Sequence, residues 1–195
     1  MSTSLTTTTT AMSNPFIYKH DKIQMLLSKK LSKDNTLNRQ GSGNAKFTYI
    51  ESWKVIQLAN QIFGYNGWSC SILDCTADYC EQDAQGKYSV GISATVKVTL
   101  TNGASHEDIG FGSSENQGKK GAAIEKAKKE AISDARKRAL RCFGDALGNS
   151  LYDKAHLKRI SSKNGNTGDD LLQNTMIDEM NNFHSIKEEH RVNNK

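Results

Sequence analysis

The segment Lys119–Gly148, KKGAAIEKAKKEAISDARKRALRCFGDALG, decides the fold that we predict for this chain of 195 residues. Its apolar positions recur with helical spacing and form one broad stripe that is rich in alanine. The stripe consists of Ile124, Ala127, Ala131, Ile132, Ala135, Ala139, Phe143 and Leu147. We therefore predict a single helix of about 29 residues, about 43 Å long at 1.5 Å per residue, whose alanines pack closely against a sheet.

The same segment concentrates the positive charge of the chain. Between Lys119 and Arg141 there are nine Lys or Arg residues and three Asp or Glu residues, a net charge of +6, whereas the whole chain carries +5. A solvated helix face normally carries opposite charges one turn apart, but Arg136–Arg141 contains no acidic residue. A localised basic surface of this kind is typical of a protein that binds nucleic acid.

Three cations near the end of this segment are the strongest candidates for contact with phosphates. Lys137 and Arg141 are one helical turn apart, so they can hold neighbouring phosphate groups, and Arg138 lies one step round the helix. Lys126 shares a side of the helix with Lys137 and Arg141. Because such cations contact phosphate rather than base edges, the surface predicts affinity without sequence preference.

Other candidates carry an alternative of equal or greater weight. Lys119 and Lys120 stand at the start of the predicted helix, where the macrodipole disfavours cations and a bound anion would relieve the conflict. A merely solvated helix end is an equal interpretation of these two lysines. Single-strand binding also commonly uses aromatic stacking, for which Tyr65 and Tyr79 are the candidates, although Tyr65 is equally well a turn residue that closes a helix.

A three-stranded antiparallel sheet is predicted before the basic helix. Residues 88–100 alternate between apolar and small polar side chains, the pattern of a strand with one buried and one wet face. Asn102-Gly103 reads as a hairpin turn, so His106–Gly112 is the expected partner strand. A strand around Trp68–Cys75 completes the sheet. We expect the wet face to line the surface that binds a partner.

A helix is predicted before the sheet. Thr48 and Glu51 have the spacing of a capping box, and Gly64 ends the helix. The residues expected to share its apolar face are Trp53, Ile56, Ala59 and Phe63, and the opposite face carries Lys54, Gln57 and Gln61. The residues from 38 to 44 are rich in Gly, Ser and Asn and are predicted to form a loop.

The predicted fold class is α+β, with an α-β-β-β-α core in which the sheet packs on the long basic helix. Short helices are expected over Asp21–Ser32 and Tyr152–Ile160, so one domain spans residues 15–160. Residues 1–14 and 161–195 are polar and are predicted to be disordered tails. No run of about 18 apolar residues occurs, so no membrane-spanning helix is expected.

The sequence predicts no metal site, no cofactor and no enzymatic activity. Cys70, Cys75 and Cys80 are five residues apart and form no zinc-binding pair; on a regular strand they would alternate between faces, so free thiols are expected. A metal-dependent nuclease is a weak alternative suggested by His106–Asp108. On a strand only His106 and Asp108 share a face, and two ligands are too few.

Three motifs together resemble the amino-terminal annealing domain of the eukaryotic Rad52 family. They are WKVIQLANQIFGYNGW at Trp53–Trp68, HEDIGFG at His106–Gly112 and EKAKKEAISDARKRALRCFGDALG at Glu125–Gly148. The resemblance extends in order over about Ile23 to Leu157. It implies ring-shaped homo-oligomers that hold single-stranded DNA in a basic groove with the bases outward, and it implies no nucleotide hydrolysis and no metal.

The resemblance also assigns residues. It implies that Lys137, Arg138 and Arg141 are inner-groove cations, that Lys54 replaces an arginine of the first helix, and that Tyr65 is the family's aromatic. Lys119 or Lys120 is implied in an outer DNA site. A nuclear location is implied, and a mitochondrial one stays open. Family members continue into Pro-rich segments that recruit a RecA-like recombinase and the single-strand-binding protein; because this chain has one proline and stops at Lys195, we do not expect the full recruiting role.

Two other functions remain as alternatives. The α-β-β-β-α order and the GKKGAA start of the last helix also resemble a double-stranded RNA-binding module, although the unit here is longer. A third possibility is an accessory subunit that assembles with a longer family member.

Overall fold

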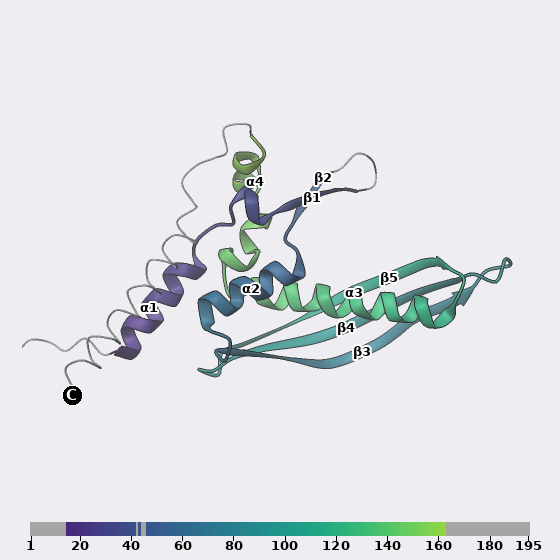
Figure 1. The fold of residues 1–195 in the computed structure, drawn as a ribbon, viewed down its shortest axis with the longest axis horizontal. Coiled ribbons are helices and arrows are strands. Elements are labelled where there is room, and N and C mark those ends of the chain that lie inside the picture. Colours follow the sequence, from purple (N-terminus) through teal and green to yellow (C-terminus); the bar gives the residue numbers. More distant parts are fainter. Residues whose placement is uncertain (1–14, 42, 44–45, 163–195) are drawn as a thin grey trace, which may run out of the picture.

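The structure, a computed structural model, describes residues 15–41, 43 and 46–162 and confirms the α+β class. The elements are α1 (Pro15–Leu27), β1 (Leu37–Gln40), β2 (Lys46–Tyr49), α2 (Ser52–Phe63), β3 (Trp68–Gln82), β4 (Tyr88–Leu100), β5 (Ser105–Gln117), α3 (Lys120–Arg141) and α4 (Lys154–Ser161). Short 3-10 turns occupy Lys33–Asn35, Asp145–Leu147 and Asn149–Tyr152. In Figure 1, α3 lies along the three-stranded sheet, and the remaining helices and the β1–β2 hairpin gather at one end of it. Of the predicted tails 1–14 and 161–195, residues 1–14 and 163–195 lie outside the described residues, and Ser161 is the last residue of α4 rather than part of a tail.

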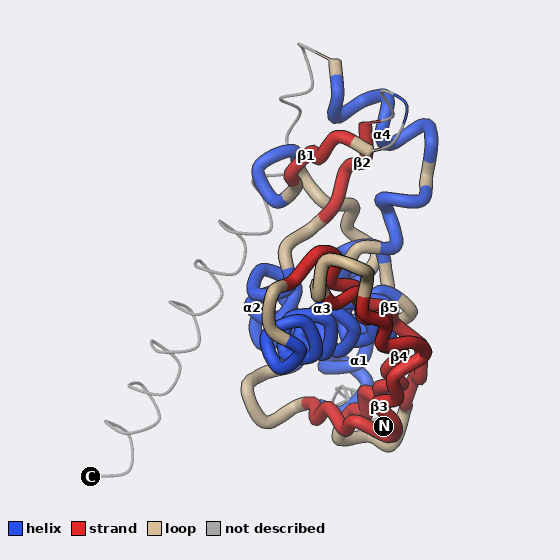
Figure 2. Tube along the Cα trace, turned by 90° about the vertical axis from the view of Figure 1, so that its right-hand side faces the viewer, coloured by secondary structure: helices blue, strands red, loops and turns tan. Residues whose placement is uncertain are grey.

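The three-stranded sheet has the predicted order β3-β4-β5, and both pairs are antiparallel. The alternation predicted for β4 is confirmed, because its inward residues are at most 1% exposed. These residues are Val90, Ile92, Ala94, Val96 and Val98. The two flanking strands are longer than predicted: β3 continues to Gln82 and β5 to Gln117. Figure 2 shows α2 and α3 on the same side of this sheet.

The alanine stripe of α3 packs directly on β5, as predicted. Five alanines of the helix, Ala123, Ala127, Ala131, Ala135 and Ala139, are fully buried. Opposite them, a Cβ on Gly110 would lie 2.1 Å from the backbone nitrogen of Ala135, and a Cβ on Gly112 would lie 2.2 Å from the carbonyl oxygen of Ala127. The helix and the strand therefore touch backbone to backbone, with no side chain between them.

The basic helix is shorter than predicted, because α3 ends at Arg141 rather than continuing to Gly148. After Arg141 the chain turns against α1, where a Cβ on Gly144 would lie 2.6 Å from the carbonyl oxygen of Leu27. The turn buries Leu147 completely in the core formed by α1, α2 and the end of α3. Burial of this leucine stabilises the turn.

The apolar face of α2 differs from the predicted one. Its buried residues are Val55, Leu58, Ala59, Ile62 and Phe63, whereas Trp53 is 60% exposed. The predicted capping box is wrong, since the helix begins after Glu51 with no side-chain cap. The Thr48 hydroxyl instead donates to Asn38 across the β1–β2 hairpin, at 2.9 Å. Gly64 ends α2 as expected, with a φ of 88°.

The other short elements are shifted from their predicted positions. The loop predicted at residues 38–44 is contradicted over residues 38–40, which belong to β1 and pair with β2. The first helix runs over Pro15–Leu27 instead of Asp21–Ser32, and Leu31 is fully buried beyond its end. Helix α4 begins at Lys154, two residues later than predicted.

The cysteines of β3 do not alternate between the two faces of the strand as predicted, because β3 is not regular. The pairing register slips between Ile72 and Asp74 and again between Ala77 and Tyr79. Each slip adds one residue, so that Cys70, Cys75 and Cys80 all lie opposite inward-facing residues of β4. The partners are Val98, Ala94 and Val90, respectively. The three thiols therefore share a face, contrary to the prediction, and the thiols are free.

Asp153 links the segment after α1 to the start of α4. Its contacts predict how the stability of the fold depends on acid pH. Its carboxylate accepts from the backbone N–H groups of Ala155 and His156 as the cap of α4 and binds Lys30 Nζ at 2.5 Å. The hydrogen bond from Lys30, followed by that from His156, lowers the pKa of Asp153 to about 2. A carboxylate with a lowered pKa stabilises the fold above its unfolded pKa of 3.8 and loses this contribution as the pH falls toward 2.

We therefore expect Asp153→Asn, which keeps a capping side chain but no charge, to be less stable than the unsubstituted protein above pH 4. The difference in free energy of unfolding should shrink steadily as the pH falls from about 4 to 2. Urea unfolding followed by circular dichroism between pH 2 and 6 measures it. A difference that does not change with pH would show that the charge of Asp153 plays no part.

Candidate nucleic-acid interface

Two of the predicted cations at the end of α3 share one carboxylate. Arg138 Nε donates to Asp108 Oδ1 at 3.0 Å, and Arg141 Nη2 lies 3.6 Å from Asp108 Oδ2. Asp108 is placed by the sheet, because it lies opposite the inward-facing Val96 and therefore points to the side of α3. The side chain of Asp108 is 19% exposed, whereas that of Arg138 is 39% exposed. The carboxylate thus sits under two guanidinium groups, and one positive charge of the three groups remains.

This arrangement keeps Arg138 charged. Burial alone would lower the pKa of Arg138, but the hydrogen bond to Asp108 and the charges of Asp108 and Asp134 together raise it. Arg138 binds Asp108 through Nε, at the inner side of the guanidinium. A guanidinium has five N–H donors, so the group retains donors for a further anion.

Arg141 has an aromatic neighbour that the sequence analysis did not identify. Its guanidinium carbon lies 4.4 Å from the ring centre of Tyr152, a cation–π contact. The ring of Tyr152 is 67% exposed. The two residues meet because the chain turns after Arg141. This contact was not predicted, because the helix was expected to continue to Gly148.

Lys54 lies at the same end of α3 as Arg141, although it comes from a different helix. A Cβ on Gly148 would lie 3.6 Å from Ile50 Cγ2 and 3.8 Å from Arg141 Cβ. Lys54 follows Ile50 by four residues in the first turn of α2. These contacts place the segment before α2 beside the end of α3, where Lys137, Arg138 and Arg141 lie. We call Lys54, Lys137, Arg138 and Arg141 the basic cluster; all four are partly exposed.

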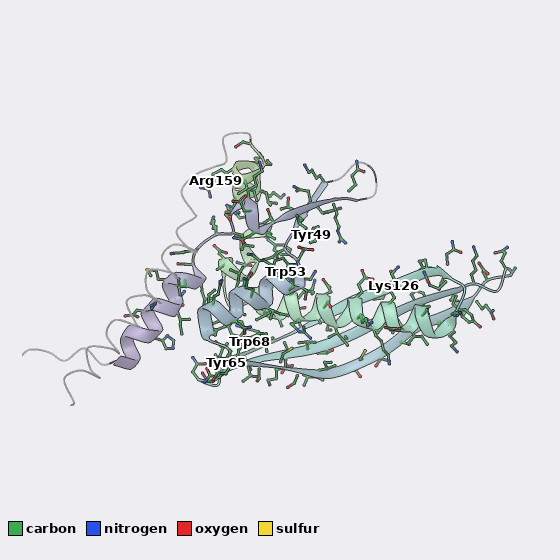
Figure 3. The ribbon with its side chains drawn as sticks, viewed as in Figure 1. Tyr49, Trp53, Tyr65, Trp68, Lys126 and Arg159 are labelled. Carbon is green, nitrogen blue, oxygen red and sulfur yellow. The ribbon has the colours of Figure 1, made fainter. Side chains whose placement is uncertain are left out.

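The remaining candidate cations lie elsewhere. Lys119, Lys120 and Lys126 are exposed toward the opposite end of α3. At 1.5 Å per residue, Lys120 is about 32 Å and Lys126 about 23 Å along the helix axis from Arg141. Figure 3 shows Lys126 far from Trp53, which marks the start of α2. These three lysines can serve only a contact distinct from that of the basic cluster.

The two tyrosine candidates are also outside the basic cluster. Tyr65 is 87% exposed, but it follows the far end of α2 and lies beside Trp68 (Figure 3). Tyr79 lies flat on β4, where a Cβ on Gly91 would be 2.1 Å from its ring, and its hydroxyl donates to Glu115 at 2.9 Å. The hydrogen bond to Glu115 is the main cause of the raised pKa of Tyr79.

The wet face of β4 does not line the basic cluster, contrary to the sequence-based expectation. Its residues lie on the face of the sheet that α3 does not cover, and Lys97 there pairs with Glu107 at 2.9 Å. Two exposed apolar residues of β5, Ile109 and Phe111, lie opposite Thr95 and Ser93 on the same face.

The residues that suggested a nuclease are all engaged in other contacts. The ring of His106 packs edge-on against Phe143 with centres 4.6 Å apart, Glu107 binds Lys97, and Asp108 binds two arginines. Within residues 15–41, 43 and 46–162, no three His, Cys, Asp or Glu side chains are grouped so as to hold a metal ion. Among the helices of these residues, none has the length and apolar character needed to span a membrane.

Comparison with known proteins identifies the family. Residues 19–169 match the family described as Rad52/22 family double-strand break repair protein. The chain is 52% identical over 140 residues to the DNA repair and recombination protein RAD52 of Saccharomyces cerevisiae, a match that covers 72% of this chain and 30% of that protein. It is 51% identical over 143 residues to the protein of the same name in Candida glabrata, covering 73% of this chain and 28% of that protein.

A third relative is the DNA repair and recombination protein rti1 of Schizosaccharomyces pombe. It is 50% identical over 142 residues, which are 73% of this chain and 38% of the relative. The chain thus spans about a third of the length of the curated relatives it matches. The matched region contains α2, the sheet, α3 and α4, so it includes every residue of the basic cluster. The resemblance seen in the three sequence motifs is therefore confirmed, and the chain belongs to the Rad52/22 family of double-strand break repair proteins.

Proposed function

We propose that the chain binds single-stranded DNA and anneals complementary strands during the recombinational repair of double-strand breaks. The observation that carries the proposal is the basic cluster: three partly exposed cations stand in the last turns of α3, and Lys54 stands in the first turn of α2. Ile50, just before α2, lies beside Gly148 and Arg141. The ammonium and guanidinium groups of the cluster neutralise successive phosphates of one strand, with Asp108 offsetting one of the charges. The pairing energy of the bases drives annealing, and the protein makes and breaks no covalent bond.

Self-association is the second part of the proposal. Apolar side chains are exposed on both outer strands of the sheet: Ile72 and Leu73 in β3, and Ile109 and Phe111 in β5, are between 49% and 59% exposed. Exposed apolar residues that gather on one element are typical of protein contact surfaces. We propose that further copies of the chain cover them in a ring, and that a longer family member is the alternative partner. We place the protein in the nucleus, and we do not extend the proposal to recruitment of a recombinase.

The proposal is tested by substrate choice and by annealing. We expect the purified protein to bind oligodeoxythymidine more tightly than duplex RNA of equal length in fluorescence anisotropy. The logarithm of the binding constant should fall with that of the salt concentration, by about 0.7 for each phosphate contacted. Complementary labelled strands should anneal faster with the protein, also in EDTA. A preference for duplex RNA would support the RNA-binding alternative, and the absence of both activities would refute the proposal.

Assembly is tested separately by size-exclusion chromatography with light scattering. A particle of many subunits, with or without an oligonucleotide, agrees with a ring. A monomer that becomes large only with a longer family member would instead support the accessory-subunit alternative.

Asp108 gives a specific prediction for this site. Asp108→Asn removes a negative charge that competes with phosphate for Arg138 and Arg141, so we expect affinity for oligodeoxythymidine to rise by about threefold. Glu107→Gln is the matched control, since the neighbouring carboxylate binds Lys97 on the other face of the sheet and should leave the affinity unchanged. Weaker binding by a folded Asp108→Asn variant would show that Asp108 holds the arginines in their binding orientation.

A further inference from the structure

Two exposed aromatic side chains lie beside cations of the basic cluster. Trp53 is 60% exposed, and Tyr152 is 67% exposed. Large aromatic residues are usually mostly buried, because their rings contribute much apolar area to a core. Here each ring has a cation over it: Lys54 Nζ is 5.6 Å from the ring centre of Trp53, and Arg141 Cζ is 4.4 Å from that of Tyr152.

Both rings are fixed in orientation although they are exposed. Trp53 stands in the first turn of α2, and its Nε1 donates to Glu51 Oε2 at 3.0 Å. The indole is thus held at its edge by a carboxylate and on its face by Lys54. Tyr152 ends the second 3-10 turn after α3 and lies against Arg141. A ring that is already held in place loses little entropy when another flat group stacks on it.

The two aromatic–cation pairs belong to the same region of the surface. Ile50 and Arg141 both lie beside Gly148, since a Cβ there would be 3.6 Å from Ile50 Cγ2 and 3.8 Å from Arg141 Cβ. Trp53 follows Ile50 by three residues, and Tyr152 follows Gly148 by four. By contrast, Figure 3 places Tyr65 at the other end of α2 from Trp53. The aromatic residues that accompany the basic cluster are therefore Trp53 and Tyr152.

We propose that Trp53 and Tyr152 are stacking platforms for nucleobases of the single strand that the basic cluster holds. In each pair the cation contacts a phosphate and the ring contacts a base. Every base has a flat π face, so this contact adds affinity without sequence preference. Stacking uses the face of the base and leaves its pairing edge free, which annealing requires. The inference rests on the proposed function and adds a second chemical component to the same site.

The test compares two probes of equal length and charge: oligodeoxythymidine and an oligomer of abasic deoxyribose phosphate. The unsubstituted protein should bind the thymidine probe more tightly. Trp53→Ala with Tyr152→Ala should lose about tenfold or more in affinity for the thymidine probe, given the usual strength of base–aromatic stacking. Affinity for the abasic probe should not change. Trp53→Phe with Tyr152→Phe keeps both rings and should retain most of the preference for thymidine.

The outcomes separate the possible failures. If the alanine variant loses affinity for both probes equally, the aromatic residues support the fold or the cations, and the stacking proposal is overturned. It is also overturned if the unsubstituted protein binds both probes equally well. If the unsubstituted protein binds neither probe, the proposed function itself fails.

A spectroscopic measurement adds an independent check. The chain has two tryptophans, and Trp68 donates through Nε1 to Asn60 at the other end of α2. In a Trp68→Phe background, the fluorescence of Trp53 should be quenched by oligodeoxythymidine and remain unchanged with the abasic probe. An equal response to both probes would contradict stacking on Trp53.

Discussion

Replacement of Lys137 and Arg141 with alanine is expected to weaken the binding of oligodeoxythymidine by about 100-fold at physiological salt. Each charged contact with a phosphate is worth about 1.4 kcal/mol, and each such loss is a factor of ten. The salt dependence should also become shallower by about 1.4 in the logarithmic slope, since two phosphate contacts are lost. Fluorescence anisotropy titrations at several salt concentrations measure both quantities.

A matched control separates local contact from overall charge. Lys87→Ala with Lys128→Ala removes the same two charges, one from the turn before β4 and one from the middle of α3, and both residues are exposed outside the basic cluster. This control should bind nearly as well as the unsubstituted protein. Equal weakening by both double variants would mean that only net charge matters. Unchanged affinity and slope for Lys137→Ala with Arg141→Ala would remove the basis of the proposed function.

Gly112→Val is expected to lower the free energy of unfolding by about 3 kcal/mol or more. The new Cβ would lie 2.2 Å from a backbone oxygen of α3 and 2.4 Å from the backbone nitrogen of Ala131, so the whole helix must move. Overpacking of this kind typically costs about 1–3 kcal/mol, and backbone atoms cannot rotate away as a side chain does. For a domain of this size the melting temperature should fall by roughly 6–12 °C.

Gly121→Ala is the control, for which the free energy of unfolding should change in the opposite direction. Gly121 lies in the first turn of α3, and a Cβ there would meet no atom within 4 Å. Gly121→Ala should therefore stabilise the protein by up to about 1 kcal/mol through the reduced entropy of the unfolded chain. Thermal unfolding by circular dichroism compares both variants. If Gly112→Val melts as the unsubstituted protein does, α3 and β5 are not in backbone contact.

The sequence predicted the elements in which a long, regular spacing of apolar residues faces the core. Strand β4 alternates strictly over 88–100, and its buried face was predicted correctly. The alanines of α3 repeat every four residues, and four of the five buried ones were predicted, whereas Ala123 and Leu140 were missed. Local patterns fail where tertiary contacts decide. The helix was predicted to continue because the apolar spacing runs on to Leu147, whereas the turn after Arg141 involves the close approach of Gly144 to distant Leu27.

The candidate site was also predictable only in part, because some of its contacts join residues distant in the sequence. The charge density of α3 identified Lys137, Arg138 and Arg141 from the sequence, and the family resemblance added Lys54. The ion pair of Arg138 with Asp108 joins residues 30 positions apart. No local sequence pattern predicts this pair. Trp53 was assigned to the buried face because a large aromatic at helical spacing is normally a core residue. Only the position of the actual core, along Val55 and Leu58, shows that Trp53 points outward.

The contact between the glycines of β5 and the alanines of α3 fixes the position of α3 on the sheet. A shift of α3 by one residue along β5 would bring Lys126 or Lys128 beneath the sheet in place of Ala127, which is prohibitive for a charged group. The helix therefore has a single position on the sheet, and the backbone positions from which its Lys and Arg side chains extend are fixed relative to β5. If the chain binds single-stranded DNA as proposed, the strand must adapt its backbone to α3, so strands of any base composition would be held in the same geometry.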